Sequence, residues 1–231
     1  DTLNADKSNA VLFPTWYSAY HTENEWLIGK DKTLDPERYF VIMPNQLGNG
    51  LSSSPSNMPV PFGGADFPAL SFRDQIAAQH KLVTEYFGIS ELALVLGSSM
   101  GAAQTYQWAV SHPDMVARAA PICGSPKTSE HNQVFLASLR AALSADQTFA
   151  GGRYDPDKLP TAGLRAFARV YAGWGFSQAF YWQQAYQNLG FSSLAEFLTD
   201  FWEAFFLDGR DPNNLLSMLE VWKAGDVGQT P

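Results

Sequence analysis

The stretch Glu91–Gly101, read ELALVLGSSMG, decides the fold expected for this chain. Its apolar run Leu92–Leu96 is too short for a helix of its own and predicts a buried strand. The run stops at Gly97–Gly101, a G-x-S-x-G pentapeptide, and good helix formers follow directly. The sequence therefore predicts a strand, a sharp turn and a helix, with Ser99 in the turn.

This order of elements predicts a nucleophile elbow, the turn that lifts a serine hydroxyl clear of the backbone. Such a strained serine needs glycine two residues before and after it, and Gly97 and Gly101 meet that need. The partial positive charge at the start of the next helix favours an oxyanion beside the serine. We therefore predict Ser99 as a nucleophile and the backbone N–H of Met100 as an oxyanion donor. A chance match of the pentapeptide is the alternative, and the flanking strand and helix argue against it.

Composition bounds the class of protein. The 231 residues are 45% hydrophobic, enough for one large domain or a core domain with an insertion. The net charge of -8 and the lack of a Lys/Arg cluster argue against nucleic acid or an anionic membrane as a partner. No apolar run approaches the roughly 18 residues of a membrane span. His80 and Glu85 are not at metal-ligand spacing, so no metal site is expected.

The single cysteine, Cys123, excludes an internal disulfide and a Cys-rich metal site. A reducing compartment, and hence a cytoplasmic location, is the expectation. Cys123 ends a predicted strand beyond the elbow, and we expect it to be a small buried residue rather than part of a site.

Strands and helices are expected to alternate in the first half of the chain. The short apolar segments Ala10–Phe13, Tyr39–Met43 and Val116–Cys123 predict further strands. Ser71–Phe87 predicts a helix that Ser71 caps and that stops at Gly88, and a helix and loop are expected between Trp26 and Leu34. This alternation predicts a parallel sheet with crossover helices.

The second half of the chain has a different character. No run between residues 125 and 225 is typical of a core strand, and helices are expected near residues 130–145, 161–172, 177–188, 192–206 and 212–223. We predict a partial core in residues 1–124, a helical cap in 125–225 and the start of a return to the core in 226–231.

Five aromatic residues of the predicted cap share one helix face: Phe197, Phe201, Trp202, Phe205 and Phe206. Packing between helices is the favoured interpretation for each of them. Lining of an acyl or alkyl pocket is the alternative.

The order of these pieces resembles the homoserine O-acetyltransferase group of the α/β-hydrolase superfamily, from about Leu3 to the last residues. Besides the elbow, the likeness rests on these stretches: Thr2-Leu3-Asn4, Leu34–Ile42 (LDPERYFVI), Asp66-Phe67-Pro68, Ser71–Asp74 (SFRD) and Trp108–Pro113. It implies an α/β-hydrolase fold with a mostly parallel sheet, of which this chain carries the central strands, and a helical cap insertion.

The resemblance also implies roles for single residues. Ser99 would form an acyl-enzyme, and a second oxyanion donor would come from the backbone of Thr15 or Trp16. Arg169 falls where the family holds a substrate carboxylate, with a solvated surface arginine as the alternative. Phe176, also at the substrate site, stands where the family has an aromatic hydroxyl.

Two departures bear on specificity: Phe176, and Ala102, which stands where the family has a second glycine after the elbow methionine. The resemblance implies acyl transfer from acetyl-CoA, as co-substrate, to an alcohol, with no bound cofactor. Hydrolysis of a small acetyl ester is the alternative, and a fragment that only binds is the third possibility. A homodimer, or the remainder of the same enzyme, is the expected macromolecular partner.

A serine nucleophile needs a base, and in this superfamily the acid and the histidine follow the serine in the chain. His21 and His80 precede Ser99, and His112 lies roughly 20 Å along the helix that leaves the elbow. His131 opens the predicted cap and, like His21, is expected to be structural. We therefore expect the catalytic acid and histidine outside this sequence, which would make the chain an internal portion of a longer enzyme.

Overall fold

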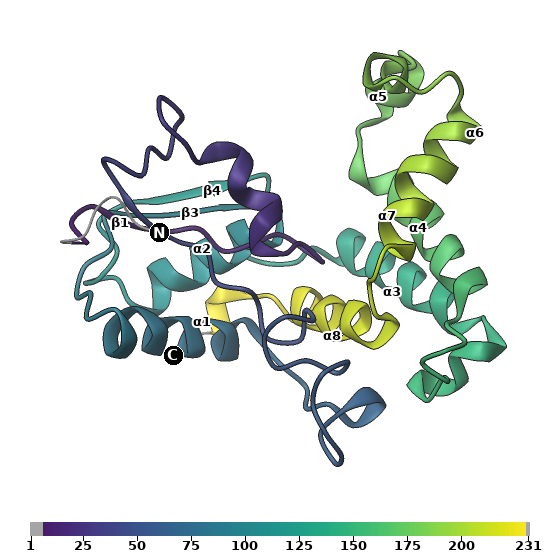
Figure 1. Ribbon diagram of the computed structural model, residues 1–231, viewed down its shortest axis with the longest axis horizontal. Coiled ribbons are helices and arrows are strands. Elements are labelled where there is room, and N and C mark those ends of the chain that lie inside the picture. Colours follow the sequence, from purple (N-terminus) through teal and green to yellow (C-terminus); the bar gives the residue numbers. More distant parts are fainter. Residues whose placement is uncertain (1–6, 230–231) are drawn as a thin grey trace.

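The computed structural model describes residues 7–229, and its centre is a parallel sheet with the strand order β2-β1-β3-β4 (Figure 1). The strands are β1 (Ala10–Leu12), β2 (Phe40–Ile42), β3 (Leu94–Ser98) and β4 (Ala119–Ile122). Each lies within a predicted strand or, for β3, extends it into the elbow. The expected parallel arrangement is confirmed, because β1 pairs with β2 and β3, and β3 pairs with β4, all in parallel register. Thr2-Leu3-Asn4 lies outside the described residues.

Two helices, α1 (Phe72–Lys81) and α2 (Met100–Ser111), pack on one face of this sheet. Ser71 caps α1 as predicted, since its side chain accepts a hydrogen bond from the backbone of Asp74. The last turn differs from the expectation of a regular helix, because Leu82–Tyr86 is a π-helix. Gly88 follows with a φ of +68°, the left-handed conformation that favours glycine at a helix end.

The other face of the sheet is covered by a short 3-10 helix and irregular chain rather than by a crossover helix. Leu34 and Leu96 pack there with residues Leu27 and Ile28. The short helix expected between Trp26 and Leu34 is a 3-10 helix at His21–Leu27 instead. The earlier start has a local cause, because the Glu23 side chain accepts a hydrogen bond from the backbone N–H of Tyr20 (2.8 Å) and so caps the helix N-terminus.

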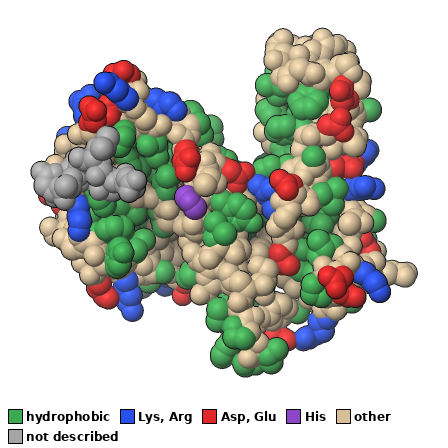
Figure 2. All heavy atoms as spheres, in the orientation of Figure 1, with side chains coloured by type: hydrophobic (Ala, Val, Ile, Leu, Met, Phe, Trp, Pro, Cys, Tyr) green, Lys and Arg blue, Asp and Glu red, His purple; other side chains and the backbone are tan. Residues whose placement is uncertain are grey.

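The second half of the described chain is helical, as predicted. Its helices are α3 (Glu130–Ser144), α4 (Thr161–Gly175), α5 (Gln178–Trp182), α6 (Leu194–Glu196), α7 (Ala204–Leu207) and α8 (Pro212–Lys223). Two 3-10 helices, Gln147–Gly152 and Ala185–Leu189, and a π-helix, Phe197–Glu203, complete the set. We call residues 130–223 the cap. Its outer helices α5–α7 stand apart from the sheet, and the surface is notched between the two (Figures 1 and 2). The exact domain limits stay a prediction.

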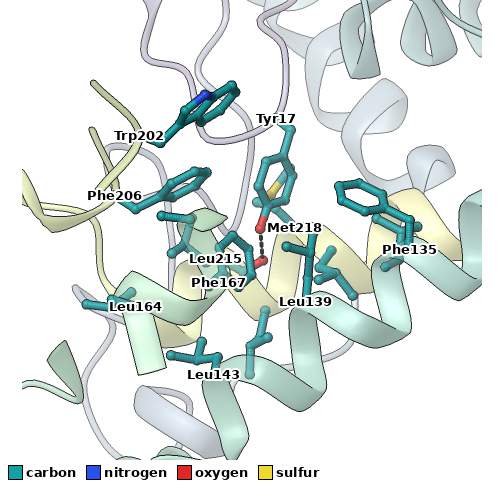
Figure 3. Packing of buried hydrophobic residues seen from close by; sticks show 14 of the residues in the cluster. Tyr17, Phe135, Leu139, Leu143, Leu164, Phe167, Trp202, Phe206, Leu215 and Met218 are labelled. Atoms are coloured by element: carbon teal, nitrogen blue, oxygen red, sulfur yellow. Dashed lines mark hydrogen bonds between the residues drawn. The ribbon is translucent and has the colours of Figure 1, made fainter. Parts of the chain in front are cut away.

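Tyr17, from the loop after β1, joins the sheet to the cap. Its ring is fully buried in the cap's hydrophobic cluster, stacked 5.7 Å from Tyr171. Its hydroxyl donates a hydrogen bond to the backbone oxygen of Leu215 in α8 (2.8 Å; Figure 3). Burial raises the pKa of this phenol well above its usual value, so the hydroxyl keeps its proton and remains a donor.

Candidate active site

Ser99 is the single residue between β3 and α2, and its backbone is strained. Its φ of 55° lies in the left-handed region, which costs a residue other than glycine about 1–3 kcal/mol. Neighbours hold it there: the Ser99 N–H donates to the Ile122 oxygen (2.9 Å), and the Ser99 oxygen accepts from Ala102 N–H (3.0 Å). The predicted strand, turn and helix are therefore present, with the serine at the carboxyl end of a parallel strand.

Both glycines of the pentapeptide are required by close approach of the backbone. A Cβ placed on Gly97 would lie 2.1 Å from the Gly101 oxygen, and one placed on Gly101 would lie 2.5 Å from the Pro14 oxygen. The second distance also shows that the loop after β1 packs directly against the elbow. That loop is where the second oxyanion donor is predicted.

A third glycine, for which no role was predicted, supports the elbow. A Cβ on Gly124, just past β4, would lie 2.7 Å from the Ser99 oxygen and 2.5 Å from the Ala102 Cβ. The methyl group that Ala102 carries, where the resembled family has glycine, is therefore accommodated by the bare backbone of Gly124. The departure at Ala102 leaves the elbow intact.

The two candidates for the second oxyanion donor differ in position. Trp16 lines the same cavity as Ser99, whereas Thr15 is completely buried and does not. The N–H of Met100 is at the start of α2, where the first turn of a helix leaves its N–H groups free. These positions favour Trp16 over Thr15 as the partner of Met100, and the donor assignments stay predictions.

Buried amides hold the loop that carries Trp16. The Thr15 oxygen accepts hydrogen bonds from Gln46 Nε2 (3.0 Å) and Gln104 Nε2 (3.2 Å). Gln104 Oε1 in turn accepts from Gln79 Nε2 (2.7 Å), whose Oε1 accepts from Trp108 Nε1 (2.8 Å). This series of buried hydrogen bonds thus fixes the loop after β1, α1 and α2 to one another. Gln79 and Gln104 lie on buried faces of predicted helices, which is the signal that could have identified them.

A cavity of about 500 Å³ opens at Ser99 between the sheet and the cap. No charged side chain of the described residues lines it. Ser99, Ser18 and Cys123 contribute to its wall together with Gly175. The remaining lining residues are aromatic: Trp16, Tyr17, Tyr171, Trp174, Phe176, Phe201, Trp202, Phe205, Phe206 and Trp222.

The predicted aromatic face contributes much of this wall. Phe197 is fully buried against neighbouring rings, as the packing interpretation expected. For the other four, Phe201, Trp202, Phe205 and Phe206, that interpretation was incomplete, because they also line the cavity. Phe197–Glu203 is a π-helix, in which each backbone hydrogen bond joins residues five apart instead of four. Each turn is therefore wider than in an α-helix, and neighbouring aromatic side chains can share the face that lines the cavity.

Phe176 lines the cavity and stacks on Phe180, with ring centroids 4.1 Å apart. Tyr171, for which the sequence predicts no role, also lines the cavity. Its hydroxyl makes no hydrogen bond with the residues that the structure describes, and burial raises its pKa. Tyr171 follows Phe167 by one helical turn, and this spacing could have placed it on the same apolar face. The substrate role of Phe176 stays a prediction.

Arg169 lies outside the cavity lining and binds a carboxylate of the protein itself. Its Nε is 2.5 Å from Oε1 of Glu203, and Arg165 approaches the other oxygen at 3.5 Å. Glu203 is only 6% exposed, so these arginines neutralise a buried charge. The predicted binding of a substrate carboxylate by Arg169 is not supported by this placement, and it stays a prediction.

The four histidines all belong to the described part of the chain, and none lines the cavity. His80 and His112 stack with their centroids 4.2 Å apart, and the pKa of His112 is lowered by burial and by the charge of His80. His21 is hydrogen bonded to an asparagine side chain, and His131 packs edge-on against a tryptophan of the cavity wall. Within residues 7–229 the cavity therefore holds a serine and no histidine.

The expectation for Cys123 was wrong. Its side chain is exposed and lines the cavity with Ser99. The reason is its place in the sheet: β4 ends at Ile122, so Cys123 lies beyond the carboxyl end of the strand, where parallel sheets open toward their sites. Its φ of 54° turns the chain sharply at this point.

Two kinds of feature are absent from residues 7–229. No group of three or more His, Cys, Asp or Glu side chains in this range could hold a metal ion. No helix in the same range is both long and apolar enough to cross a membrane.

Comparison with known proteins agrees with this geometry. A profile of the family described as alpha/beta hydrolase fold matches residues 23–176. The chain is 46% identical to the ethyl acetate hydrolase of Pseudomonas veronii, over 98% of this chain and 65% of that protein. A solved acetylester hydrolase from Corynebacterium glutamicum has a TM-score of 0.94 and 44% identity, over 99% of this chain and 66% of the other. A homoserine O-acetyltransferase from Methanohalobium evestigatum is 38% identical over 73% of this chain and 37% of that protein.

The chain thus spans about two thirds of the length of the first two proteins. The resemblance to homoserine O-acetyltransferases is confirmed, at lower identity than the resemblance to ester hydrolases. The matched range contains the elbow and the whole of α4, which contributes Tyr171, Trp174 and Gly175 to the cavity wall. Together with the parallel sheet and the strained serine, this shows that the chain belongs to the alpha/beta hydrolase fold family.

Proposed function

We propose that the protein hydrolyses small acetyl esters through an acyl-enzyme on Ser99. The observation that carries this proposal is the cavity at Ser99, which is walled by aromatic rings and lacks any charged side chain among the described residues. Such a wall suits a neutral ester and offers nothing to an amino-acid carboxylate. The names of the relatives that are 44–46% identical, an ethyl acetate hydrolase and an acetylester hydrolase, support the same class of substrate.

The reaction would proceed in two steps. Ser99 Oγ attacks the ester carbonyl and loses its proton to a base, while the backbone N–H groups of Met100 and Trp16 stabilise the oxyanion. The intermediate expels the alcohol, which takes up that proton, and leaves an acetyl group on Ser99. Water then attacks the acetyl-enzyme, releases acetate and restores the serine. No histidine of the described residues lines the cavity, so this proposal requires a base from outside them.

Acyl transfer from acetyl-CoA to homoserine is the second candidate, and the 38% identical relative favours it. The two functions share the acyl-enzyme and differ in the acceptor. The full-length protein should release acetate from ethyl acetate and p-nitrophenyl acetate at a rate that added homoserine does not change. Formation of O-acetylhomoserine from acetyl-CoA at a rate above that of ester hydrolysis would reverse the assignment.

Arg169→Ala separates the two candidates further. Because the Arg169 side chain binds Glu203 and lies outside the cavity, we expect kcat/KM for p-nitrophenyl acetate to change by less than about threefold. Stability should fall by about 1–3 kcal/mol, since a buried carboxylate loses a partner. Arg165→Ala, which removes the longer 3.5 Å contact, is the matched control and should cost less. Selective loss of a homoserine-dependent reaction in Arg169→Ala would restore its role as a carboxylate ligand.

Cys123 provides a test of where the substrate binds. Alkylation of this exposed thiol by N-ethylmaleimide would place a bulky adduct in the cavity beside Ser99. We expect ester turnover to fall at least about tenfold in the labelled protein, because the adduct competes with the substrate for space. Cys123→Ala should keep its activity and resist the reagent. Equal inactivation of this variant would place the sensitive thiol elsewhere.

A further inference from the structure

Gly175, the last residue of α4, belongs to the wall of the cavity at Ser99. Its φ lies outside the left-handed region, so its backbone conformation does not require glycine. Space is what excludes a side chain, because a Cβ at this position would lie 2.3 Å from Cη2 and 2.7 Å from Cζ2 of Trp202. Trp202 lines the same cavity. The missing side chain of Gly175 therefore leaves the room that the Trp202 indole occupies.

Aromatic rings hold the Trp202 indole on its other sides. The ring centroids of Phe201, Tyr171 and Phe176 lie 5.3, 5.6 and 5.7 Å, in that order, from the centroid of the indole. Only 7% of Trp202 is exposed. The indole is therefore fixed by close packing, and the part of it that stays open belongs to the cavity wall.

The cavity of about 500 Å³ is the empty space next to this contact. Protein interiors are close-packed, so a side chain that is pushed aside moves more readily into a void than into packed neighbours. A methyl group at position 175 would therefore move the Trp202 indole toward the cavity. Less room would then remain for a molecule bound at Ser99.

We propose that Trp202 determines the length of the ester that the cavity accepts, and that Gly175 is the residue that positions it. This inference rests on the proposed ester hydrolysis and adds the size selection of that reaction. One methylene more or less in an apolar pocket changes discrimination between substrates by roughly 10- to 200-fold. A small displacement of the indole is therefore sufficient for a measurable change in selectivity.

Two series of esters measure this selection in the full-length protein: straight-chain alkyl acetates from ethyl to octyl, and p-nitrophenyl esters from acetate to octanoate. Gly175→Ala should shorten the longest chain accepted in at least one series, with kcat/KM for that ester about tenfold lower relative to the shortest ester. Trp202→Phe removes the ring atoms that lie next to Gly175 and should lengthen the accepted chain in the same series. The series that responds shows whether the alcohol or the acyl portion contacts Trp202.

The double variant Gly175→Ala/Trp202→Phe tests whether the two residues act on each other. Phenylalanine at position 202 relieves the contact with the added methyl group, so the chain-length profile should return toward that of the unsubstituted protein. Gly173→Ala is the matched control, because it adds the same methyl group to α4 where nothing lies within 4 Å. Its profile should be unchanged.

A uniform loss of activity across both series in Gly175→Ala, or the same shift in Gly173→Ala, would overturn the role of this pair. If Gly175→Ala does not fold, Trp202→Phe decides alone: a longer accepted chain supports the proposal, and an unchanged profile overturns it. An unsubstituted full-length protein that hydrolyses no ester of either series would contradict the proposed function instead, so the two failures are distinguishable.

Discussion

Replacement of Ser99 by alanine in the full-length protein is expected to lower ester turnover by more than about a thousandfold. The side chain supplies the atom that forms the acyl-enzyme. Among the described residues that line the cavity, only Ser99 joins the end of a strand directly to the start of a helix. Stability should change little, because alanine meets the same backbone strain at a φ of 55°. Hydrolysis of p-nitrophenyl acetate and labelling by a fluorophosphonate measure the loss.

Ser98→Ala is the matched control for this experiment. Ser98 belongs to the same pentapeptide, but it ends β3 and does not line the cavity. Its variant should keep both turnover and labelling. If Ser99→Ala hydrolysed the ester at the normal rate, or if Ser98→Ala lost the activity, the assignment of the nucleophile would be wrong.

A methyl group at Gly97 should destabilise the fold by about 3 kcal/mol or more. The added Cβ of Gly97→Ala would lie 2.1 Å from the Gly101 oxygen and 2.7 Å from Thr105 Oγ1, so β3 and α2 would have to separate. Urea unfolding measures the change in the free energy of unfolding, and ester turnover should fall with it because the same movement displaces Ser99.

Gly173→Ala makes the same chemical change in open space. Gly173 lies within α4, and a Cβ there would meet nothing within 4 Å. Since alanine is the better helix former, this variant should gain about 1 kcal/mol of stability. If Gly97→Ala unfolded at the same midpoint urea concentration as the unsubstituted protein, the close packing of the elbow would be contradicted.

Local patterns were sufficient to predict the elements that depend on neighbours in the chain. The apolar run before Gly97 and the helix formers after Met100 define β3, the turn and α2 without any tertiary information. The same holds for α1, where Ser71 caps the helix as the sequence predicted.

The cavity wall was harder to predict because it depends on contacts between residues far apart in the chain. Whether Cys123 is buried depends on where β4 ends relative to Ser99, and strand limits are poorly defined by sequence. The role of Gly124 depends on its approach to Ala102 across the sheet. The Ser18 hydroxyl is unpaired because the surrounding polar groups bind other partners, and hydrophobic periodicity along the sequence carries no information on such pairing.

The bond between Tyr17 and α8 links the position of the cap to the chemistry at the sheet. Tyr17 directly follows Trp16, so the residue that anchors the cap is adjacent to the predicted oxyanion donor. Lifting the whole cap as a rigid body would break the bond to Leu215 and separate Tyr17 from Tyr171, and it would pull on the Trp16 backbone. Displacement of α8 relative to the sheet is therefore expected to disturb the backbone beside the predicted oxyanion donor.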